Sequence, residues 1–297
     1  MSELRASVMP VVSRPSVYFI LSKPDVTFLV VITTCAGFCL ASKGPFEWLR
    51  FANAILGTTL VAAGTAALNQ YIERAQDARM RRTAQRPLPL GLIQPWEALC
   101  FGIAMIAAGS VYLALLTNLL ACALALLTSV MYLGAYTPLK QRTTLATAVG
   151  AFPGAVPPLI GWAAATGSLS LGAWILFAIL FFWQFPHFLA IAWMYREDYS
   201  RAGIRMLPVV DRTGDATYRQ IIVCAAVLLP LTLLPSIVGI TGIRYFFGAV
   251  ILGLILLQVC LWANRLRTNA SAKWLMHATV IHIPVLLSLM VFDKFVR

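Results

Sequence analysis

The sequence has few charged residues. Only 11% of its 297 positions are Asp, Glu, Lys or Arg, whereas 60% are hydrophobic. Soluble globular domains carry about 25% charged residues, so this composition excludes an ordinary soluble fold. Nucleic-acid binding is also excluded as the reason for the net charge of +12, because it requires a basic face on a folded soluble domain.

Motifs of several common site types are missing as well. The six cysteines lie in apolar segments and form no Cys-x-x-Cys pair, which argues against a disulfide framework and a zinc site. The chain has no Walker loop, no dinucleotide-binding glycine fingerprint and no Ser-His-Asp set. These absences argue against the nucleotide-binding proteins and serine hydrolases that those motifs define.

Long apolar runs are abundant instead. A transmembrane helix needs about 20 apolar residues, and nine runs approach that length. We therefore predict an all-α polytopic membrane protein with nine transmembrane helices. Residues 1–23 are expected to form a cytoplasmic N-terminal segment, and residues 24–297 a single transmembrane domain. The runs lie near residues 25–42, 48–68, 95–116, 119–136, 145–165, 171–194, 220–240, 245–264 and 274–292.

The basic residues favour one orientation. If the nine spans alternate in direction, eighteen of the 23 Lys and Arg residues fall on the side of the N-terminus and five fall opposite. This bias places the N-terminus in the cytoplasm. Acidic residues follow no such rule, yet nine of the eleven lie on the same side, the exceptions being Glu47 and Asp293. The clustering of acids on one side indicates a functional site there.

The second apolar run ends in a polar pattern. Asn69, Glu73 and Asp77 recur every four residues, so on an α-helix their side chains lie along one face. Oxygen ligands with two carboxylates suit Mg²⁺, and guanidinium groups such as those of Arg82 and Arg86 match phosphate geometry. The stretch therefore predicts a metal-assisted diphosphate site. We expect its helix to continue without a break to the residue before Pro87.

A second acidic cluster follows the sixth run. Glu197 and Asp198 are candidate metal ligands that would face the first cluster across one pocket. Ordinary ion pairs with neighbours such as Arg201 are the alternative explanation. Lys140 and Arg142, in a short loop on the same side, are candidates for diphosphate binding or simple positive-inside anchors.

An aromatic stretch precedes the second acidic cluster. It contains Trp183 and His187, and an ionisable residue inside a membrane span is often functional. We expect His187 to position the acceptor substrate or to ligate an iron, although a hydrogen-bonded packing role explains a single histidine equally well. Aromatic neighbours, including Phe181, Phe182 and Phe185, are candidates for lining a dry pocket.

Taken together, these motifs resemble the UbiA-type intramembrane prenyltransferases, and in particular the haem branch of that family. The resemblance covers nearly the whole chain. One departure is Ala202, four residues after Asp198, where related enzymes of quinone pathways have Asp. The matching motifs are Lys23-Pro24, Asn69-x-x-x-Glu73-x-x-x-Asp77-x-x-Met80-x-Arg82-Thr83, Arg86-Pro87-Leu88, Tyr136-Thr137-Pro138-Leu139-Lys140, Trp183-Gln184-x-Pro186-His187-Phe188 and Glu197-Asp198-Tyr199.

The resemblance implies the UbiA-type fold, the cofactor Mg²⁺ and a particular reaction. The donor would be farnesyl diphosphate and the acceptor the vinyl group of haem b (protoheme IX), giving haem O and diphosphate. The expected catalytic residues are Asn69, Glu73, Asp77, Arg82 and Lys140. The expected metal ligands are Asn69, Glu73, Asp77, Glu197 and Asp198, and the expected substrate-binding residues are Arg86, Arg142, His187, Trp183, Tyr136 and Arg201.

Two alternative functions stay open. An aromatic prenyltransferase of quinone biosynthesis would use the same donor chemistry, whereas a secondary transporter would place its coupling residues near the middle of the bilayer. We expect a multi-pass protein of the bacterial inner membrane rather than the mitochondrial one, because the polar N-terminus has no pattern of a targeting peptide. The expected partners are the lipid bilayer and a haem A synthase or an assembly factor of a terminal oxidase.

Overall fold

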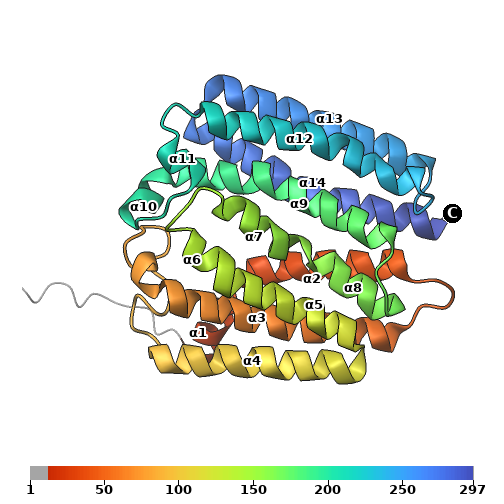
Figure 1. Cartoon of the computed structure of the whole chain (residues 1–297), viewed down its shortest axis with the longest axis horizontal. Coiled ribbons are helices and arrows are strands. Elements are labelled where there is room, and N and C mark those ends of the chain that lie inside the picture. The colour runs from red at the N-terminus through yellow and green to blue at the C-terminus, as the bar shows by residue number, and fades with distance from the viewer. Residues whose placement is uncertain (1–12, 297) are drawn as a thin grey trace, which may run out of the picture.

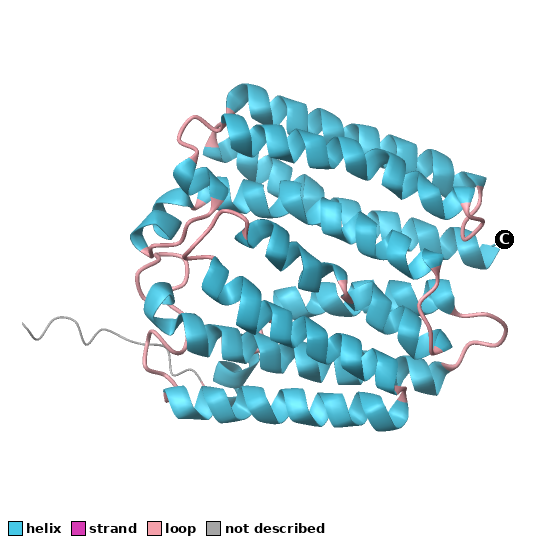
Figure 2. Cartoon of the chain, in the orientation of Figure 1, coloured by secondary structure: helices cyan, strands magenta, loops and turns pink. Residues whose placement is uncertain are grey.

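The structure is a computed structural model that describes residues 13–296. All regular elements in this range are helical (Figures 1 and 2), so the predicted all-α fold is confirmed. Residues 1–12, which begin the predicted cytoplasmic segment, and Arg297 lie outside the described residues. The helices are α1 (Arg14–Leu21), α2 (Pro24–Ala41), α3 (Trp48–Asp77), α4 (Pro95–Leu116), α5 (Leu119–Val130), η1 (Met131–Tyr136), α6 (Thr137–Leu139), α7 (Ala146–Ala155), α8 (Pro157–Thr166), α9 (Leu171–Met194), α10 (Arg196–Arg201), α11 (Leu207–Val210), α12 (Asp215–Ile237), α13 (Ile243–Leu266) and α14 (Asn269–Val296).

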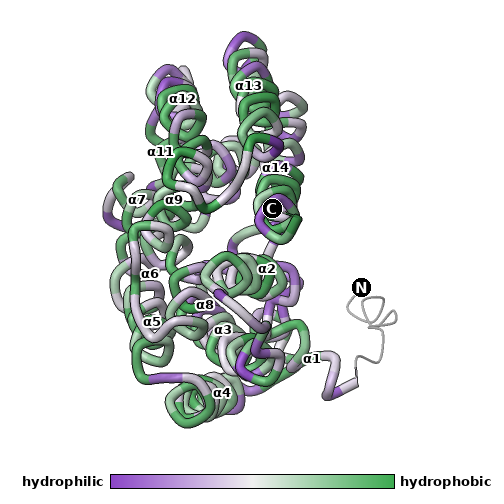
Figure 3. The backbone as a smooth tube through the Cα atoms, turned by 90° about the vertical axis from the view of Figure 1, so that its right-hand side faces the viewer, coloured by the Kyte–Doolittle hydropathy of each residue, from purple (hydrophilic) through white to green (hydrophobic). Residues whose placement is uncertain are grey.

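Nine helical stretches of the described chain are long and apolar enough to cross a membrane, as predicted, when α5 to α6 and α7 to α8 are each counted as one. The most apolar windows of the α7–α8 stretch and of α9 are 72% and 61% buried, whereas those of α4 and α13 are 22% and 28% buried. The end-on view shows α4 and α13 at opposite edges of the bundle (Figure 3). The central helices therefore pack against protein, and the outer helices present apolar side chains toward lipid.

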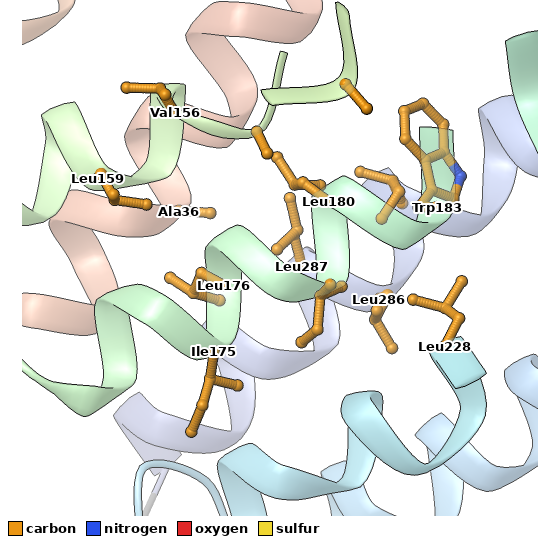
Figure 4. Close-up of a cluster of buried hydrophobic side chains, with 14 of the residues drawn as sticks. Ala36, Val156, Leu159, Ile175, Leu176, Leu180, Trp183, Leu228, Leu286 and Leu287 are labelled. Atoms are coloured by element: carbon orange, nitrogen blue, oxygen red, sulfur yellow. The ribbon is translucent and has the colours of Figure 1, made fainter. Parts of the chain in front are cut away.

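The core is built around α9. Leu176, Leu180 and Trp183 of α9 are buried, as are Leu286 and Leu287 of α14, and they belong to one hydrophobic cluster (Figure 4). Lipid tails are as apolar as leucine, so helix association in a membrane depends on close packing rather than on removal from water. The close fit of these side chains therefore contributes directly to the arrangement of the bundle.

A very close helix contact joins α2 to α8. A Cβ atom on Gly161 would lie 2.0 Å from the carbonyl oxygen of Thr34, and one on Gly37 would lie 2.1 Å from that of Pro158. Only glycine permits the two backbones to approach this closely. The contact therefore fixes the position of α2, whose first residue follows Lys23.

Prolines break the fifth span. α7 ends at Ala155 and α8 begins at Pro157, which is followed by Pro158, and neither proline can donate a helical hydrogen bond. The Pro153 carbonyl, which would otherwise accept from residue 157, accepts from the Val156 backbone at 3.3 Å. Side chains of neighbouring helices also bond to the broken span. Gln184 Nε2 donates to the Ala151 carbonyl at 2.9 Å and so joins the broken span to α9. The Thr34 hydroxyl of α2 lies between the carbonyls of Val30, at 2.8 Å, and Pro157, at 3.2 Å.

Two charged residues close the opposite end of the bundle. Lys294 Nζ donates to the carbonyl oxygens of Cys39, Leu40 and Ser42 at 2.7–2.8 Å, at the end of α2. The neighbouring Asp293 accepts a hydrogen bond from the Gly242 backbone, just before α13. These contacts give Asp293, an acid on the opposite side from most others, a structural role.

We predict that Gly161→Ala destabilises the bundle, because the new methyl group would overlap the Thr34 carbonyl. Overpacking of a tight core costs about 1–3 kcal/mol, and the change should lower the unfolding temperature in detergent. Gly253→Ala is the matched control, since its Cβ would meet only the movable side chain of Leu229, at 3.1 Å. Equal unfolding temperatures for the two variants would contradict the prediction.

Candidate active site

Three polar side chains of α3 face the protein interior. Asn69, Glu73 and Asp77 are 0%, 9% and 0% exposed and occupy successive turns of one helix face. The helix has 30 residues, which makes it about 45 Å long at 1.5 Å per residue. This exceeds the ~30 Å hydrocarbon layer. We therefore assign the three side chains, in its last third, to the boundary between lipid and water.

Each of these side chains is contacted by a basic group from a different segment. Lys23 Nζ donates to Asn69 Oδ1 at 2.6 Å. Lys140 Nζ pairs with Glu73 Oε1 at 2.6 Å, and Arg86 Nη1 pairs with Asp77 Oδ2 at 2.7 Å. Three basic groups thus meet two carboxylates and one neutral amide. The excess of basic groups suits an anionic ligand.

Lys23 reaches the site from the junction between α1 and α2. Its backbone is left-handed, with φ 45° and ψ 68°, which costs a non-glycine residue about 1–2 kcal/mol. The preceding helix is anchored by Gln70 Nε2, which donates to the Leu21 carbonyl at 2.9 Å. Burial, together with repulsion from Arg86, lowers the pKa of Lys23 to about 7. A strained backbone therefore holds a partly buried base beside Asn69.

Lys140 lies just after α6 against two aromatic rings. Its Nζ is 4.3 Å from the centre of the Tyr136 ring and 6.0 Å from that of Tyr132. Burial favours the neutral amine, but the neighbouring Tyr136 and Glu73 reverse this effect and raise the pKa of Lys140 above its usual range. Lys140 is therefore held in its charged form.

The chain turns back sharply after Asp77. Our prediction that the helix continues to the residue before Pro87 is wrong, because α3 ends at Asp77 and turns follow. The Thr83 hydroxyl donates to the Asp77 carbonyl at 3.0 Å, and the Met80 backbone donates to the same oxygen at 3.2 Å. These bonds replace helical ones. The reversal brings Arg86 back onto the Asp77 carboxylate.

The second acidic cluster contacts this reversal. Asp198 of α10 is buried and accepts a hydrogen bond from the Arg82 backbone at 3.2 Å, while Arg201 forms an ion pair with it. The Arg82 guanidinium lies 5.0 Å from the centre of the Tyr195 ring and 5.8 Å from that of Tyr199. The two inter-helix junctions therefore face each other and are in contact.

Glu197 is separated from this contact although it is next to Asp198. It is exposed and lines a surface pocket of about 290 Å³ together with Arg196 and Arg212. Arg142 is also exposed. In residues 13–296, no group of three or more His, Cys, Asp or Glu side chains is close enough to hold a metal ion. Any metal held here needs Asn69 and substrate oxygens as further ligands.

Trp183 and His187 of α9 are both bonded to Thr279 of α14. Trp183 Nε1 donates to the Thr279 carbonyl at 2.9 Å, and the two rings stack 5.0 Å apart. The Thr279 hydroxyl donates to Met276 O at 2.6 Å and lies 2.9 Å from His187 Nδ1. Since its hydrogen is already used, Thr279 accepts from Nδ1–H. The lone pair on His187 Nε2 is therefore available to a ligand.

Sequence analysis did not assign two of the residues that hold Asn69. One is Lys23, and the other is Thr137, whose hydroxyl accepts a hydrogen bond from Asn69 Nδ2 at 3.2 Å. Both occur in motifs that carry the family resemblance. A lysine directly before the proline that begins the first span was the available signal, whereas nothing in the local pattern links Thr137 to Asn69.

Comparison with known proteins identifies the class of this membrane protein. A family model described as the UbiA prenyltransferase family matches residues 30–282. The chain belongs to this family.

Its relatives are similar over nearly their full lengths. The chain is 45% identical to the protoheme IX farnesyltransferase of Solibacter usitatus (strain Ellin6076), with 93% of this chain and 98% of the relative covered. It is 47% identical to the protoheme IX farnesyltransferase of Koribacter versatilis (strain Ellin345), with 95% and 96% covered.

Solved structures share the fold at much lower identity. A digeranylgeranylglyceryl phosphate synthase matches with a TM-score of 0.79 at 17% identity, with 95% of this chain and 99% of that chain covered. A UbiA homologue from Archaeoglobus fulgidus bound to DMAPP and Mg²⁺ matches with a TM-score of 0.69 at 14% identity, with 94% and 99% covered. These matches support the UbiA-type fold expected from the sequence.

We predict that Lys140→Met lowers the free energy of unfolding by about 3 kcal/mol, because it leaves the Glu73 carboxylate buried without its partner. Adding Glu73→Gln to this variant should recover a large part of the loss, as measured by denaturant unfolding in detergent. The control is Arg50→Met, since Arg50 pairs at 3.2 Å with Glu47 in a largely exposed ion pair, worth at most about 1 kcal/mol. Similar losses of unfolding free energy in Lys140→Met and Arg50→Met would contradict the prediction.

Proposed function

We propose that the protein transfers the farnesyl group of farnesyl diphosphate to the vinyl group of haem b, producing haem O and diphosphate. The observation that carries this proposal is the near-full-length similarity, at 45% and 47% identity, to two protoheme IX farnesyltransferases. The structure adds a site of matching chemistry. Basic groups and carboxylates meet at the end of an apolar helix, where a substrate with a charged head and a hydrocarbon tail would lie.

The diphosphate group would bind among the basic side chains. Lys23, Lys140 and Arg86 already meet at α3, and Arg82 comes from the reversal that follows. Guanidinium and ammonium groups form strong, charge-assisted hydrogen bonds with phosphate oxygens. They would stabilise the negative charge that develops on the departing diphosphate. Arg201, which pairs with Asp198, and the exposed Arg142 are further candidates at the edge of the site.

The residues present fit Mg²⁺. Asp77 Oδ1 is buried and has no hydrogen-bond partner within the described chain, so one carboxylate oxygen is available to a cation. Asn69, Glu73 and Asp77 would hold the metal from one side, with Asp198 on the facing junction. Glu197 is less suitable because it points into the surface pocket. Bound Mg²⁺ supplies Lewis-acid stabilisation of the leaving diphosphate.

The reaction breaks the bond between C1 of the farnesyl chain and a diphosphate oxygen, and the electron pair leaves with the diphosphate. The π electrons of the vinyl group form the new carbon–carbon bond, and water adds to the resulting cation with loss of a proton. The allylic cation must be protected from water until then. Phe181 contacts Phe182 and Phe185 at ring distances of 5.4 and 5.5 Å, and this aromatic group is a candidate lining.

The acceptor would be positioned by α9. The available lone pair of His187 Nε2 makes this side chain a candidate ligand of the haem iron, and Trp183 keeps its ring in place by stacking. Thr279 fixes both side chains to α14. His187 is therefore assigned to haem binding, and the chemistry at the vinyl group is assigned to the α3 end.

The nine membrane-length helical stretches within residues 13–296 make the bilayer itself a partner of this protein. We infer that the site end faces the cytoplasm of a bacterium and that the protein lies in the inner membrane, because loops rich in Lys and Arg are retained on that side. Haem O stays in the membrane through its farnesyl tail. A haem A synthase or an assembly factor of a terminal oxidase would then receive the product.

An assay with purified protein tests this function. Farnesyl diphosphate and Mg²⁺ are supplied with haem b or with 4-hydroxybenzoate, and products are separated by mass. We expect farnesylated haem only, and Asp77→Asn should reduce its rate by more than about 100-fold, since loss of the outer partners of metal ligands already costs 10–100-fold. The control Asp215→Asn removes an acid that is 70% exposed and should retain the wild-type rate. Prenylated 4-hydroxybenzoate without farnesylated haem would overturn the proposal.

Lys23→Met tests the contribution of the N-terminal junction to diphosphate binding. We expect KM for farnesyl diphosphate to rise by about 10-fold or more, because a charge-assisted hydrogen bond contributes about 1.5–3 kcal/mol. The KM for haem b should change little. The control for net charge is Lys273→Met, which removes an exposed positive charge on α14, a different helix from the one that Lys23 precedes. An unchanged KM for farnesyl diphosphate would remove Lys23 from the diphosphate site.

A further inference from the structure

The helical span that leads to Lys140 changes its winding close to the site. α5 continues directly into η1 (Met131–Tyr136), a π-helix, and then into the short α6 (Thr137–Leu139). A π-helix has one more residue in each hydrogen-bonded turn than an α-helix and occurs often at functional sites. Here the Thr137 backbone N–H bonds to the carbonyl of Tyr132, five residues earlier.

The Thr137 side chain is fixed by the same carbonyl. Its hydroxyl donates to Tyr132 O at 2.8 Å, and Thr137 is only 3% exposed. A threonine hydroxyl has one hydrogen and can donate only once. Since the Tyr132 carbonyl can only accept, the single hydrogen of Thr137 is committed to it. The lone pairs of Thr137 Oγ1 therefore remain as acceptors on its other side.

This arrangement determines which end of the Asn69 amide faces Thr137. Asn69 Nδ2 donates to Thr137 Oγ1 at 3.2 Å, so Oδ1 points the other way and accepts from Lys23 Nζ at 2.6 Å. If the amide were rotated by half a turn, two acceptors would meet at Thr137 and two donors would meet at Lys23. Both contacts would be unfavourable in a buried position.

We propose that Thr137, held by the π-turn, is a positioning residue that directs the Asn69 carbonyl oxygen into the diphosphate site. This inference rests on the proposed function. The direction of Oδ1 matters only if a cation, or a side chain such as Lys23 that binds the diphosphate, is held at this oxygen. The relay runs from Tyr132 O through the Thr137 hydroxyl to the Asn69 amide. It joins the span that ends just before Lys140 to the helix that carries Glu73 and Asp77.

The relay also favours asparagine over aspartate at residue 69. A carboxylate would place an oxygen against Thr137 Oγ1, and the hydroxyl would have to leave Tyr132 O in order to donate to it. That carbonyl would then lose one of its two donors in the π-turn. The amide supplies both an acceptor for the site and a donor for the relay.

Metal binding measures the position of Asn69 directly. The full-length protein is purified in detergent and titrated with Mn²⁺ in the presence of inorganic diphosphate, and free Mn²⁺ is followed by electron paramagnetic resonance. Thr137→Val removes the hydroxyl at constant shape, and Thr137→Ser keeps it. We expect the Val variant to bind Mn²⁺ about 10-fold more weakly, as is typical when an outer partner of a ligand is lost. The Ser variant should stay within about 2-fold of the wild type, because it retains the hydroxyl.

A second buried threonine provides the matched control. Thr58 lies on α3, is 2% exposed, and its hydroxyl has no hydrogen-bond partner in the described chain. Thr58→Val makes the same chemical change without touching the relay and should leave Mn²⁺ affinity unchanged. If Thr137→Val does not fold, Thr137→Ala, which adds no atoms, takes its place with the same expected loss.

The outcomes separate the inference from the function on which it rests. Wild-type affinity in Thr137→Val, or an equal loss in Thr137→Ser or Thr58→Val, would overturn the positioning role. A lower unfolding temperature with unchanged Mn²⁺ affinity would show that Thr137 only stabilises the fold, and would also overturn it. A wild-type protein that binds no Mn²⁺ with diphosphate would overturn the metal site itself, and the inference with it.

Discussion

A carboxylate buried at the edge of a membrane needs a positive partner, and this requirement organises the site end of the protein. Glu73 and Asp77 take their partners, Lys140 and Arg86, from segments that follow different spans. The loop after α3 and the end of the fourth span are therefore folded onto the same helix face. The groups that hold these segments in place are also those proposed to bind the diphosphate.

Close backbone packing fixes the positions of the helices relative to each other along their axes. A Cβ atom on Gly64 of α3 would lie 2.6 Å from the Gly102 carbonyl of α4, and the contact between α2 and α8 is closer still. Helices packed this tightly cannot slide past each other without collision. Lys23, which directly precedes α2, donates from this packed framework to Asn69 of α3 at 2.6 Å. Packing between spans thus controls the geometry of charges at their ends.

The parts of the structure that depend on local pattern could be predicted from the sequence, and those that depend on distant partners could not. Nine apolar runs predict nine spans, and the spacing of Asn69, Glu73 and Asp77 predicts one helix face. The end of α3 depends instead on Thr83 and on Asp198, which lies 116 residues after Arg82. The π-turn behind Thr137 likewise has no signature in the sequence. The roles assigned to the site residues remain proposals.

The surplus of basic groups at the site is explained better by a ligand than by stability. Lys23 is partly buried, its backbone is strained, and its bonded partner is a neutral amide rather than a carboxylate. A glycine there would relieve both the backbone strain and the repulsion from Arg86. Backbone strain and charge repulsion that lower stability are commonly found at functional sites. A diphosphate would supply the negative charge that Asn69 lacks, so the least stable feature of this end is the one that most directly indicates its substrate.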